Sequence, residues 1–502
     1  MSQMQRGNRN DRLSRLPDDI LLNVLDRLNV PNAARTSVLS KRWRRLPAML
    51  SRLTISVLDF LPHNGPIFEN DEVVRSNRAV TEATNILARR DATRNTIHLL
   101  SITFFLKDGD PLSIGRAVAQ TMATHKVEMA EFTIMTEKDA SQCDDDNIAS
   151  YGKQFILFFD ACTDSFSGLT RLHLENLRFG ESGINSVLIV CMQLKDLRVF
   201  NCDSGDTPTL QVDHPQISDL SIIDCPYGQV FLNWLPKLTR MTFEGWSARH
   251  DPLSIRYAPS LEAFNLANIG LSSHEMVELS KFLRGTSVRD LKLGFKCEKI
   301  WVQPECLTKR LSSVFCQLRF VNLDEIPEGY ELTWALFILK AAPLLKKLYM
   351  TVWDHFCKME TDDEKRKALS YSDNKGVEWE SSASDFKHDS LVMLTIFGFQ
   401  SEDYMVRFIR HVMEAAVNLE EVFLYHRLAC RKCRDHPQKP LKFPFTKRQR
   451  TSVKKRITDG FDSFPVIRFP TAAGIRADHL AKLKYPIECS GFASRRYTGP
   501  CG

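Results

Sequence analysis

Four side chains that could hold a metal ion lie within eleven residues near the end of the chain: His426, Cys430, Cys433 and His436. C-x-x-C is a spacing found in zinc sites, but structural sites usually draw their second pair of ligands from farther along the chain, so that a tetrahedron can close. A redox role for the two cysteines would need a thioredoxin-like pattern around them, which the sequence lacks. We therefore expect a capping turn with reduced thiols, without a metal ion or another cofactor.

No other group of residues has the spacing of a catalytic motif. We found no phosphate-binding glycine loop, nucleophile elbow or helical zinc-protease motif, and the 13 histidines are dispersed. The 13 cysteines are scattered, and several of them, including Cys191, Cys202, Cys225 and Cys316, lie in apolar segments. This distribution is typical of buried free thiols in a reducing compartment. The sequence predicts a protein that is not an enzyme.

The charge of the chain is unevenly distributed. Residues 427–456 contain twelve Lys or Arg and one acidic residue, a balance of +11, so a total of +6 leaves 6 − 11 = −5 for the rest. We interpret the basic run at 447–456 as a solvated helix face. A nuclear import signal or a phosphate-binding patch is the alternative, although no aromatic side chain interleaves with these charges.

Length and composition favour a folded protein with a small domain and a long repeat array. The chain has 502 residues, of which 43% are hydrophobic and 25% charged. Its first twelve residues are polar and basic, unlike a secretory signal, and its longest apolar runs are too short to span a bilayer. We expect a soluble protein of the nucleus, the cytoplasm or both, without a membrane partner.

One phrase, L-x-x-L-x-L with conservative replacements, recurs along the middle of the chain. Its first five copies have their middle positions 25, 23, 21 and 23 residues apart, within the range of leucine-rich repeats. Later spacings stretch to 27, 30, 27 and then 46 residues. Weaker copies precede these at 102–104 and 130–132. The ten middle positions are Leu172, Leu197, Leu220, Met241, Phe264, Leu291, Val321, Leu348, Leu394 and Val422.

Each phrase predicts a short strand whose alternate residues point into a core, with a return segment packed behind it. One such unit cannot close its own core, but ten stacked units can. The longer spacings predict helices on the convex side, at 334–342 and 404–416. The widest gap contains a charged, serine-rich stretch that we expect to form a mobile loop at about 358–388. An α/β sheet with longer helices is the alternative to a solenoid.

The N-terminal segment 13–46 predicts three short helices. Pro17 suits a first helical position, and Asp18 and Asp19 suit the positive end of a helix dipole. Apolar residues follow at helical spacing up to Leu28, and a second helix is expected at 33–38. Ser40 can cap a third helix. So small a module buries little core by itself and is expected to bind a partner.

This segment closely resembles the F-box. The resemblance rests on Leu-Pro-Asp-Asp-Ile-Leu at 16–21, an alanine pair at 33–34, Val-Leu-Ser at 38–40 and Lys-Arg-Trp-Arg at 41–44. It implies binding to the Skp-type adaptor of a cullin-RING ubiquitin ligase; an ordinary three-helix cap is the alternative. Some of the residues at the motif positions could instead hold the helices together, Leu25 and Trp43 above all. By motif position, the candidate adaptor-binding residues are Leu16, Pro17, Ile20, Leu21, Leu25, Val38 and Trp43.

The ending of the chain, with its C-x-x-C, basic stretch, Asp-Gly turn and last apolar phrase, is similar to that of plant F-box/leucine-rich-repeat proteins. The expected fold is α/β: a three-helix F-box followed by a horseshoe-like solenoid of parallel strands with a helical or irregular convex side. The expected parts are a disordered N-terminus (1–11), the F-box (12–52), a linker or helical cap (53–96), the repeat domain (97–426) and the basic tail (427–502).

The resemblance implies a substrate-recognition subunit of an SCF-type ubiquitin ligase, whose F-box binds the adaptor and whose repeats bind a target protein for ubiquitination. One alternative is a repeat scaffold that binds proteins without ubiquitylation. Another is a nuclear protein that binds nucleic acid through its basic tail.

Overall fold

The computed structural model describes residues 16–470, except for 29, 62–69, 89, 91–95, 108, 181–182, 206–208, 247, 249–251, 270–274, 297–298, 353–361, 363, 366–385 and 428–441. The chain divides into a first unit of residues 1–205 and a second unit of residues 206–502. The expected mobile loop and the cysteine pair Cys430 and Cys433 lie largely or wholly outside the described residues. The predictions made for them therefore stay predictions.

The first unit begins with the short helices of the N-terminal module. Helix α1 (Asp18–Leu25) is followed by α2 (Val30–Arg35) and the 3-10 turn η2 (Thr36–Val38). The third expected helix is looser than predicted, because residues 41–45 form turns that lead into η3 (Leu46–Met49). Ser40 still caps this segment, since its hydroxyl accepts the Trp43 N–H at 3.3 Å.

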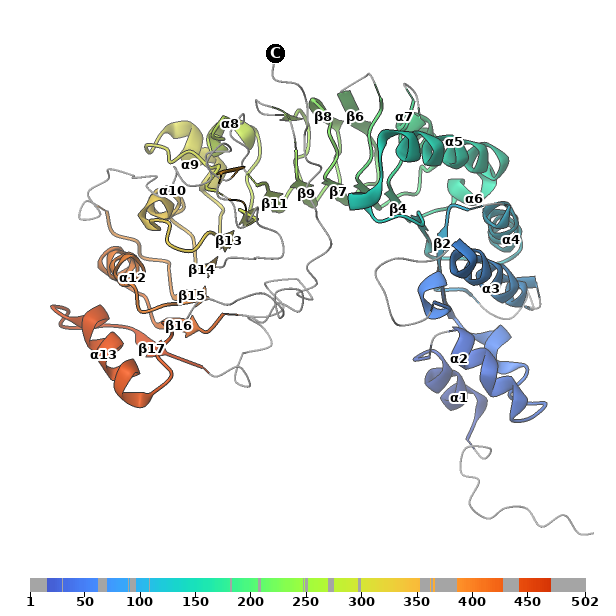
Figure 1. The fold of residues 1–502 in the computed structure, drawn as a ribbon, viewed down its shortest axis with the longest axis horizontal. Helices are drawn as coiled ribbons and strands as arrows, with labels where there is room; N and C mark the ends of the chain where they lie inside the picture. Colours follow the sequence, from blue (N-terminus) through green and yellow to red (C-terminus); the bar gives the residue numbers. More distant parts are fainter. Residues whose placement is uncertain are drawn as a thin grey trace, which may run out of the picture. The chain divides into compact units, whose positions relative to one another are not determined.

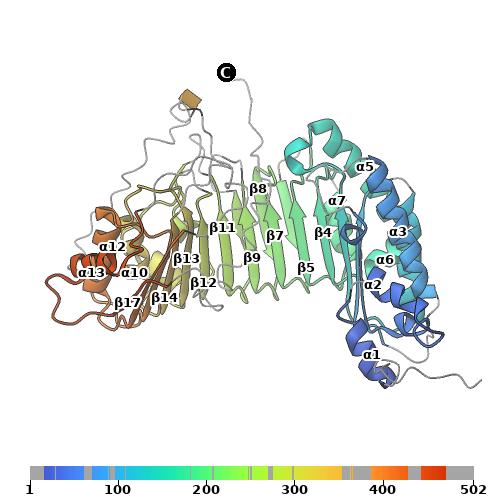
Figure 2. The same cartoon turned by 60° about the horizontal axis from the view of Figure 1, so that its bottom comes forward.

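A parallel sheet follows, with helices on one of its faces (Figures 1 and 2). Its order within this unit is β1-β2-β3-β4-β5. The strands are β1 (Arg52–Ser56), β2 (Leu99–Phe105), β3 (Ala130–Met135), β4 (Arg171–Glu175) and β5 (Asp196–Phe200). The main helices are α3 (Asn70–Ala88), α4 (Asp110–Thr124), α5 (Asp145–Ala161), α6 (Thr163–Ser167) and α7 (Gly183–Val190).

The second unit continues the same pattern with two layers of strands at its start. Strands β7, β9 and β11 to β17 form one parallel run, and the intervening strands β6, β8 and β10 form a second, three-stranded parallel sheet. The main run comprises β7 (Asp219–Ile223), β9 (Arg240–Glu244), β11 (Ala263–Ala267), β12 (Asp290–Gly294), β13 (Phe320–Ile326), β14 (Lys347–Val352), β15 (Met393–Phe397), β16 (Glu421–Tyr425) and β17 (Val466–Arg468). The small sheet comprises β6 (Thr209–Asp213), β8 (Gln229–Trp234) and β10 (Leu253–Ile255).

Helices replace the small sheet farther along the second unit. They are α8 (Leu279–Phe282), α9 (Lys309–Phe315), α10 (Leu336–Ala341), α12 (Asp403–Ala415) and α13 (Lys447–Thr458). The expected helices at 334–342 and 404–416 are thus confirmed, the first of them beginning as the 3-10 turn η6 (Thr333–Ala335).

The predicted repeat register is confirmed. In the first unit Phe132 of β3 is paired with Leu172 of β4, and Leu172 with Leu197 of β5. In the second unit every middle position from Leu220 to Val422 is paired with the next one along the sheet. All three apolar positions of each of the ten phrases are buried. Alternate residues of each strand therefore form one continuous core in each unit.

The sheet extends past both of the boundaries expected from the phrase. Strand β1 begins at Arg52, the last residue of the expected F-box, and continues into the segment 53–96 expected as linker or helical cap. Its Ile55 is paired with Ile102 of β2. Strand β17 lies in the expected tail, and its Ile467 is paired with Val422 of β16. The sequence around each strand follows the spacing of the phrase, with Leu50, Leu53 and Ile55 at the first and Phe464, Ile467 and Phe469 at the second, but both copies lie outside the regular repeat spacing.

The turn after several strands has a left-handed backbone, which explains its residue types. Asn176, Asn201, Asp224 and Gly245 all have positive φ angles, between 49° and 68°, and each lies four positions after the middle of its phrase. Short polar side chains and glycine tolerate this conformation best. The Asn201 amide donates to the Asn176 amide oxygen, and Asn176 donates to the Thr136 hydroxyl at 2.6 Å. A polar ladder thus closes the end of this part of the core.

We predict that Leu220→Asp disrupts the second unit widely, because it places a charge between two stacked strands with no water or partner in reach. The cost should be at least about 3 kcal/mol. Limited proteolysis should then cut throughout residues 206–470, and the urea midpoint should fall. Ser221→Asp, on the opposite face of the same strand, is the matched control and should have little effect. If the two variants resist protease equally, the strand register is wrong.

Candidate protein-interaction surfaces

Helix α1 carries two apolar faces side by side. Leu21 and Leu25 are fully buried and pack into the module. Ile20 and Val24, which are four residues apart and lie on the neighbouring face, are both 43% exposed. Asp18 and Asp19 occupy the first turn, where negative charge is favourable. The helix therefore folds against its own unit with one face and leaves a second apolar face to solvent.

Arg42 holds the segment after α2 against the start of α1. Its guanidinium donates to the Asp18 carboxylate at 2.7 Å and to the Leu16 carbonyl at 2.6 Å. Both links join residues more than twenty positions apart, so they fix the local arrangement of the module. Near this clamp, Val38 is 83% exposed and Leu39 is also exposed.

The structure divides the seven candidate adaptor-binding residues into two groups. Leu21, Leu25 and Trp43 are buried, so their first role is to hold the module together. Ile20, Pro17 and Val38 are exposed and Leu16 is half-buried. The exposed apolar residues Val24, Leu28 and Leu39 are not among the predicted candidates. Val24 and Leu28 continue the spacing of four residues that starts at Ile20, and this signal could have identified them.

The exposed apolar residues belong to a module that is joined firmly to the sheet. Arg90, which follows α3, donates to the Leu50 carbonyl at 2.7 Å, and burial lowers the pKa of its guanidinium. Leu46, Leu50 and Leu53 are buried where the module passes into β1. The module and the first strands thus share one core within the first unit.

The sheet face opposite the helices is charged in the first unit. Arg171 of β4 lies between Glu131 of β3, at 2.9 Å, and Asp196 of β5, at 2.7 Å. His173 lies 3.6 Å from the same Asp196. Burial raises the pKa of Glu175 to about 7, although this carboxylate accepts the Thr136 N–H at 3.0 Å. This face offers polar contacts and a group that titrates near neutral pH.

The equivalent face of the second unit changes from polar to apolar along the sheet. Lys292 of β12 pairs with Asp324 of β13 at 2.7 Å, and Lys296 lies within 3.6 Å of Asp224 and Glu244. Beyond them, strands β14 to β16 carry a buried cluster in which the rings of Phe397 and Tyr425 stack at 4.6 Å. The cluster comprises Tyr349, Met393, Phe397, Phe423 and Tyr425.

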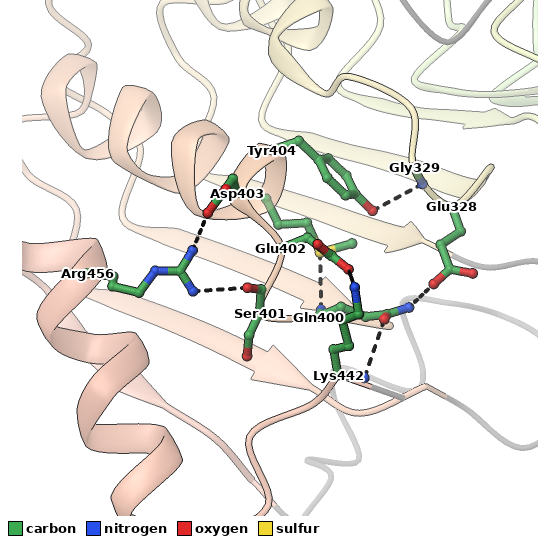
Figure 3. A network of polar contacts seen from close by, with 10 residues as sticks. Glu328, Gly329, Gln400, Ser401, Glu402, Asp403, Tyr404, Lys442 and Arg456 are labelled. Atoms are coloured by element: carbon green, nitrogen blue, oxygen red, sulfur yellow. Dashed lines mark hydrogen bonds and ion pairs between the residues drawn. The ribbon is translucent and has the colours of Figure 1, made fainter. Parts of the chain in front are cut away.

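Two arginines hold α12 and α13 together reciprocally. Arg410 of α12 donates to the carbonyls of Arg456, Ile457 and Asp459 at the end of α13, at 2.7–3.1 Å. Arg456 of α13 donates to the Ser401 carbonyl and to the Asp403 carboxylate at the start of α12 (Figure 3). Cations at helix C-termini and carboxylates at helix N-termini complement the helix dipoles.

A second set of contacts fixes the segment that leads into α13. The Gln400 side chain donates to Glu328 and accepts the Lys442 N–H at 3.4 Å, and Ser401 N–H donates to the Lys442 carbonyl at 2.9 Å (Figure 3). The Tyr404 hydroxyl accepts the Gly329 N–H at 3.2 Å. The basic segment is therefore part of the folded second unit.

The basic run at 447–456 is largely a solvated helix face, as expected. Val453 and Ile457 are the buried residues of α13, while Lys447, Arg448, Lys454 and Lys455 are exposed. Thr446 and Gln449 form a capping box at the start of the helix.

Within the described residues, no helix is long and apolar enough to cross a membrane. In the same part of the chain, no group of three or more His, Cys, Asp or Glu has a metal-binding arrangement.

Two family models match the chain. An F-box domain model matches residues 13–54, and a model described as the At1g61320/AtMIF1 LRR domain matches residues 159–456, more than half of the 502 residues. The first match covers the module with the exposed apolar face. The second covers all ten repeat phrases and most of α13.

Relatives from Arabidopsis thaliana share parts of this organisation. The F-box/FBD/LRR-repeat protein At3g52680 is 24% identical over 68% of this chain and 71% of its own length. The F-box/FBD/LRR-repeat protein At2g04230 is 27% identical over 43% of this chain and 48% of its own length. The F-box/LRR-repeat protein At3g26922 is 23% identical over 58% of this chain and 94% of its own length.

Truncating a side chain on the buried face of α1 should destabilise the module, whereas truncating one on the exposed face should not. Leu25→Ala removes a fully buried side chain and should destabilise the module by about 2–5 kcal/mol, whereas Ile20→Ala should change its stability by less than about 0.5 kcal/mol. Hydrogen exchange of the amides of residues 18–50 in the full chain measures both effects. Similar exchange in the two variants would contradict the assignment of the faces.

Glu175 should make the stability of the first unit depend on pH. Its folded pKa of about 7 lies above the ordinary value of 4.5, so its stabilising contribution is complete below pH 4.5 and is lost as the pH rises through 7. Between about pH 5 and pH 8, the wild type should lose on the order of 2 kcal/mol relative to Glu175→Gln. Urea unfolding of both proteins at the two pH values measures this difference, and parallel changes would refute it.

Proposed function

Because the chain belongs to the family of plant F-box/LRR-repeat proteins, we propose that it is the substrate-recognition subunit of an SCF-type cullin-RING ubiquitin ligase. Its F-box would bind the Skp-type adaptor and its repeats would bind a target protein for ubiquitination. The chain would contribute no catalytic group of its own, and it would work in the nucleus, the cytoplasm or both.

The exposed apolar face of the N-terminal module is the observation that carries this proposal. A module of this size has few apolar residues to spare, yet Ile20, Val24, Val38 and Leu39 remain in solvent while other leucines fill its core. Exposed apolar patches of this kind mark protein interaction sites. The Arg42 clamp holds the segment with Val38 and Leu39 next to the start of α1, so the surface is preorganised.

The shared core of the first unit supports the second half of the proposal. A receptor must transmit the position of the adaptor to its target, because its contribution is proximity and orientation. Arg90 and the buried leucines around β1 join the F-box to the first strands of the repeat sheet. A target bound at the open face of that sheet would thus be held at a defined place relative to the adaptor.

In each unit, the sheet face opposite the helices carries paired charges that could contact the target. The face of the first unit presents Arg171, His173 and the carboxylates of Glu131 and Asp196. Part of the second unit presents the Lys292–Asp324 pair on the equivalent face. Such paired charges give specificity and orientation more than affinity. We therefore propose that this face selects a target by complementary polar contacts.

The double substitution Ile20→Ala and Val38→Ala should abolish adaptor binding while the chain stays folded. Truncated central anchors cost about 2 kcal/mol or more each, so the affinity should fall at least about 100-fold. Purified full-length chain and purified Skp-type adaptor in a titration would measure this. Leu58→Ala, at a similarly exposed leucine of η4 (Val57–Asp59), is the matched control and should bind normally.

Undiminished binding by the double variant would refute this docking surface. Failure of the wild-type chain to bind any Skp-type adaptor would refute the ligase role as a whole, and would favour a scaffold that binds proteins without ubiquitylation. Adding Pro17→Ala to the double variant and to its Leu58→Ala control tests whether the surface extends to the start of α1.

A further inference from the structure

The small sheet β6–β8–β10 exposes aromatic side chains on the helix side of the second unit. Trp234, at the end of β8, is 47% exposed, and Tyr257, just after β10, is 49% exposed. The two residues are neighbours, because the Tyr257 carbonyl accepts the N–H of Leu235 at 2.9 Å. The other described tryptophans, Trp43, Trp246, Trp301 and Trp334, are all buried.

The exposure of Trp234 follows from an irregularity in the sheet. Val230 and Leu232 of β8 point into the core, and continued alternation would turn position 234 inward as well. The register between β6 and β8 shifts at Val212 and Asp213, so that Asp213 is paired with Trp234. The indole is therefore left on the outer surface, although its free energy of transfer from water favours burial.

Opposite charges flank the aromatic residues on the two edge strands. Just after β10, the Arg256 guanidinium lies over the ring of Phe231, 5.0 Å from its centroid. At the end of β6, Asp213 accepts a hydrogen bond from the Asn233 amide at 2.9 Å. Both charged residues are exposed. The order across the sheet is thus cation, aromatic centre, anion, with the charges about 10 Å apart at two strand spacings.

We propose that this face, defined by Asp213, Phe231, Trp234, Arg256 and Tyr257, binds a second copy of the same chain. A two-fold interface places the same patch on both partners, so each residue must meet its complement in the other copy. A two-fold axis that lies in the interface, parallel to β8 and over Trp234, places β10 of one copy over β6 of its partner. Arg256 then meets Asp213 at both ends, and the aromatic side chains meet in the middle.

The composition of the face fits such an interface. Trp, Tyr and Arg are the residue types that carry most of the binding energy at protein interfaces. Three partly exposed aromatic residues per copy with their polar rim would bury roughly 1,000 Å², near the lower limit for a specific contact. The dimer should therefore be reversible, with a dissociation constant on the order of micromolar. It would join two receptors through a surface separate from the F-box.

Sedimentation of the full-length chain at about 1 to 100 µM tests the proposal, because dissociation in this range spans micromolar affinity. The wild type should shift from monomer to dimer mass. Trp234→Ser, Arg256→Asp and Asp213→Arg should each remain monomeric. The double variant Arg256→Asp with Asp213→Arg should form the dimer again, because the swapped charges meet across the two-fold axis.

Two controls separate this face from general surface effects. Leu157→Ser removes a more exposed apolar side chain from α5, and Lys454→Asp reverses an exposed charge on α13. Both should dimerise like the wild type, and all variants should unfold at the wild-type temperature. A wild type that stays monomeric, or a Trp234→Ser variant that still dimerises, would overturn the proposal. A monomeric charge-swap variant would overturn the two-fold arrangement.

Discussion

In-register parallel pairing between successive short strands is the interaction on which both units depend. Each strand contributes only two or three apolar side chains to the core, as Leu220 and Ile222 do in β7. It needs its neighbours both for its backbone hydrogen bonds and to bury these side chains. Stability then comes from the interfaces between neighbours. A surface on any one repeat, polar or aromatic, is held in place by strands that lie on both sides of it.

A stacked sheet of this kind needs protection at its ends, since an end strand presents unpaired backbone groups. At the start, β1 is the first strand of the sheet order, and it continues directly from the F-box core through Leu50 and Leu53. At the other end, β17 is only three residues long and lies between Pro465 and Pro470. Proline cannot donate to a further strand, so its place beside this edge limits pairing with other chains.

The repeat register could be predicted from the sequence because the phrase specifies side-chain direction residue by residue. Strands β1 and β17 were not predicted, although Leu50, Leu53 and Ile55 around the first and Phe464, Ile467 and Phe469 around the second follow the spacing of the phrase. Ile55 lies 47 residues before Ile102 of β2 and Ile467 lies 45 residues after Val422 of β16, so neither strand falls within the regular repeat spacing. Within the F-box the sequence could not separate buried positions from exposed ones. Ile20 and Leu21 are adjacent and chemically alike, and only the packing of α1 shows that one is exposed and the other is buried.

The length of the return segment decides what packs behind each strand. Spacings of 23, 21 and 23 residues between the middle positions from Leu197 to Phe264 leave room only for β6, β8 and β10. Spacings of 25 residues or more give helices, such as α7, α9 and α12.

Strands in a second layer have the same spacing, about 4.8 Å, as those of the main sheet, whereas packed helices need 8–10 Å. A layer of strands can therefore lie flat over the main sheet, whereas a layer of helices would force the main sheet to curve. The shortest repeats thus produce a flat outer face, and Trp234 and Tyr257 lie on it because no helix is present to cover them.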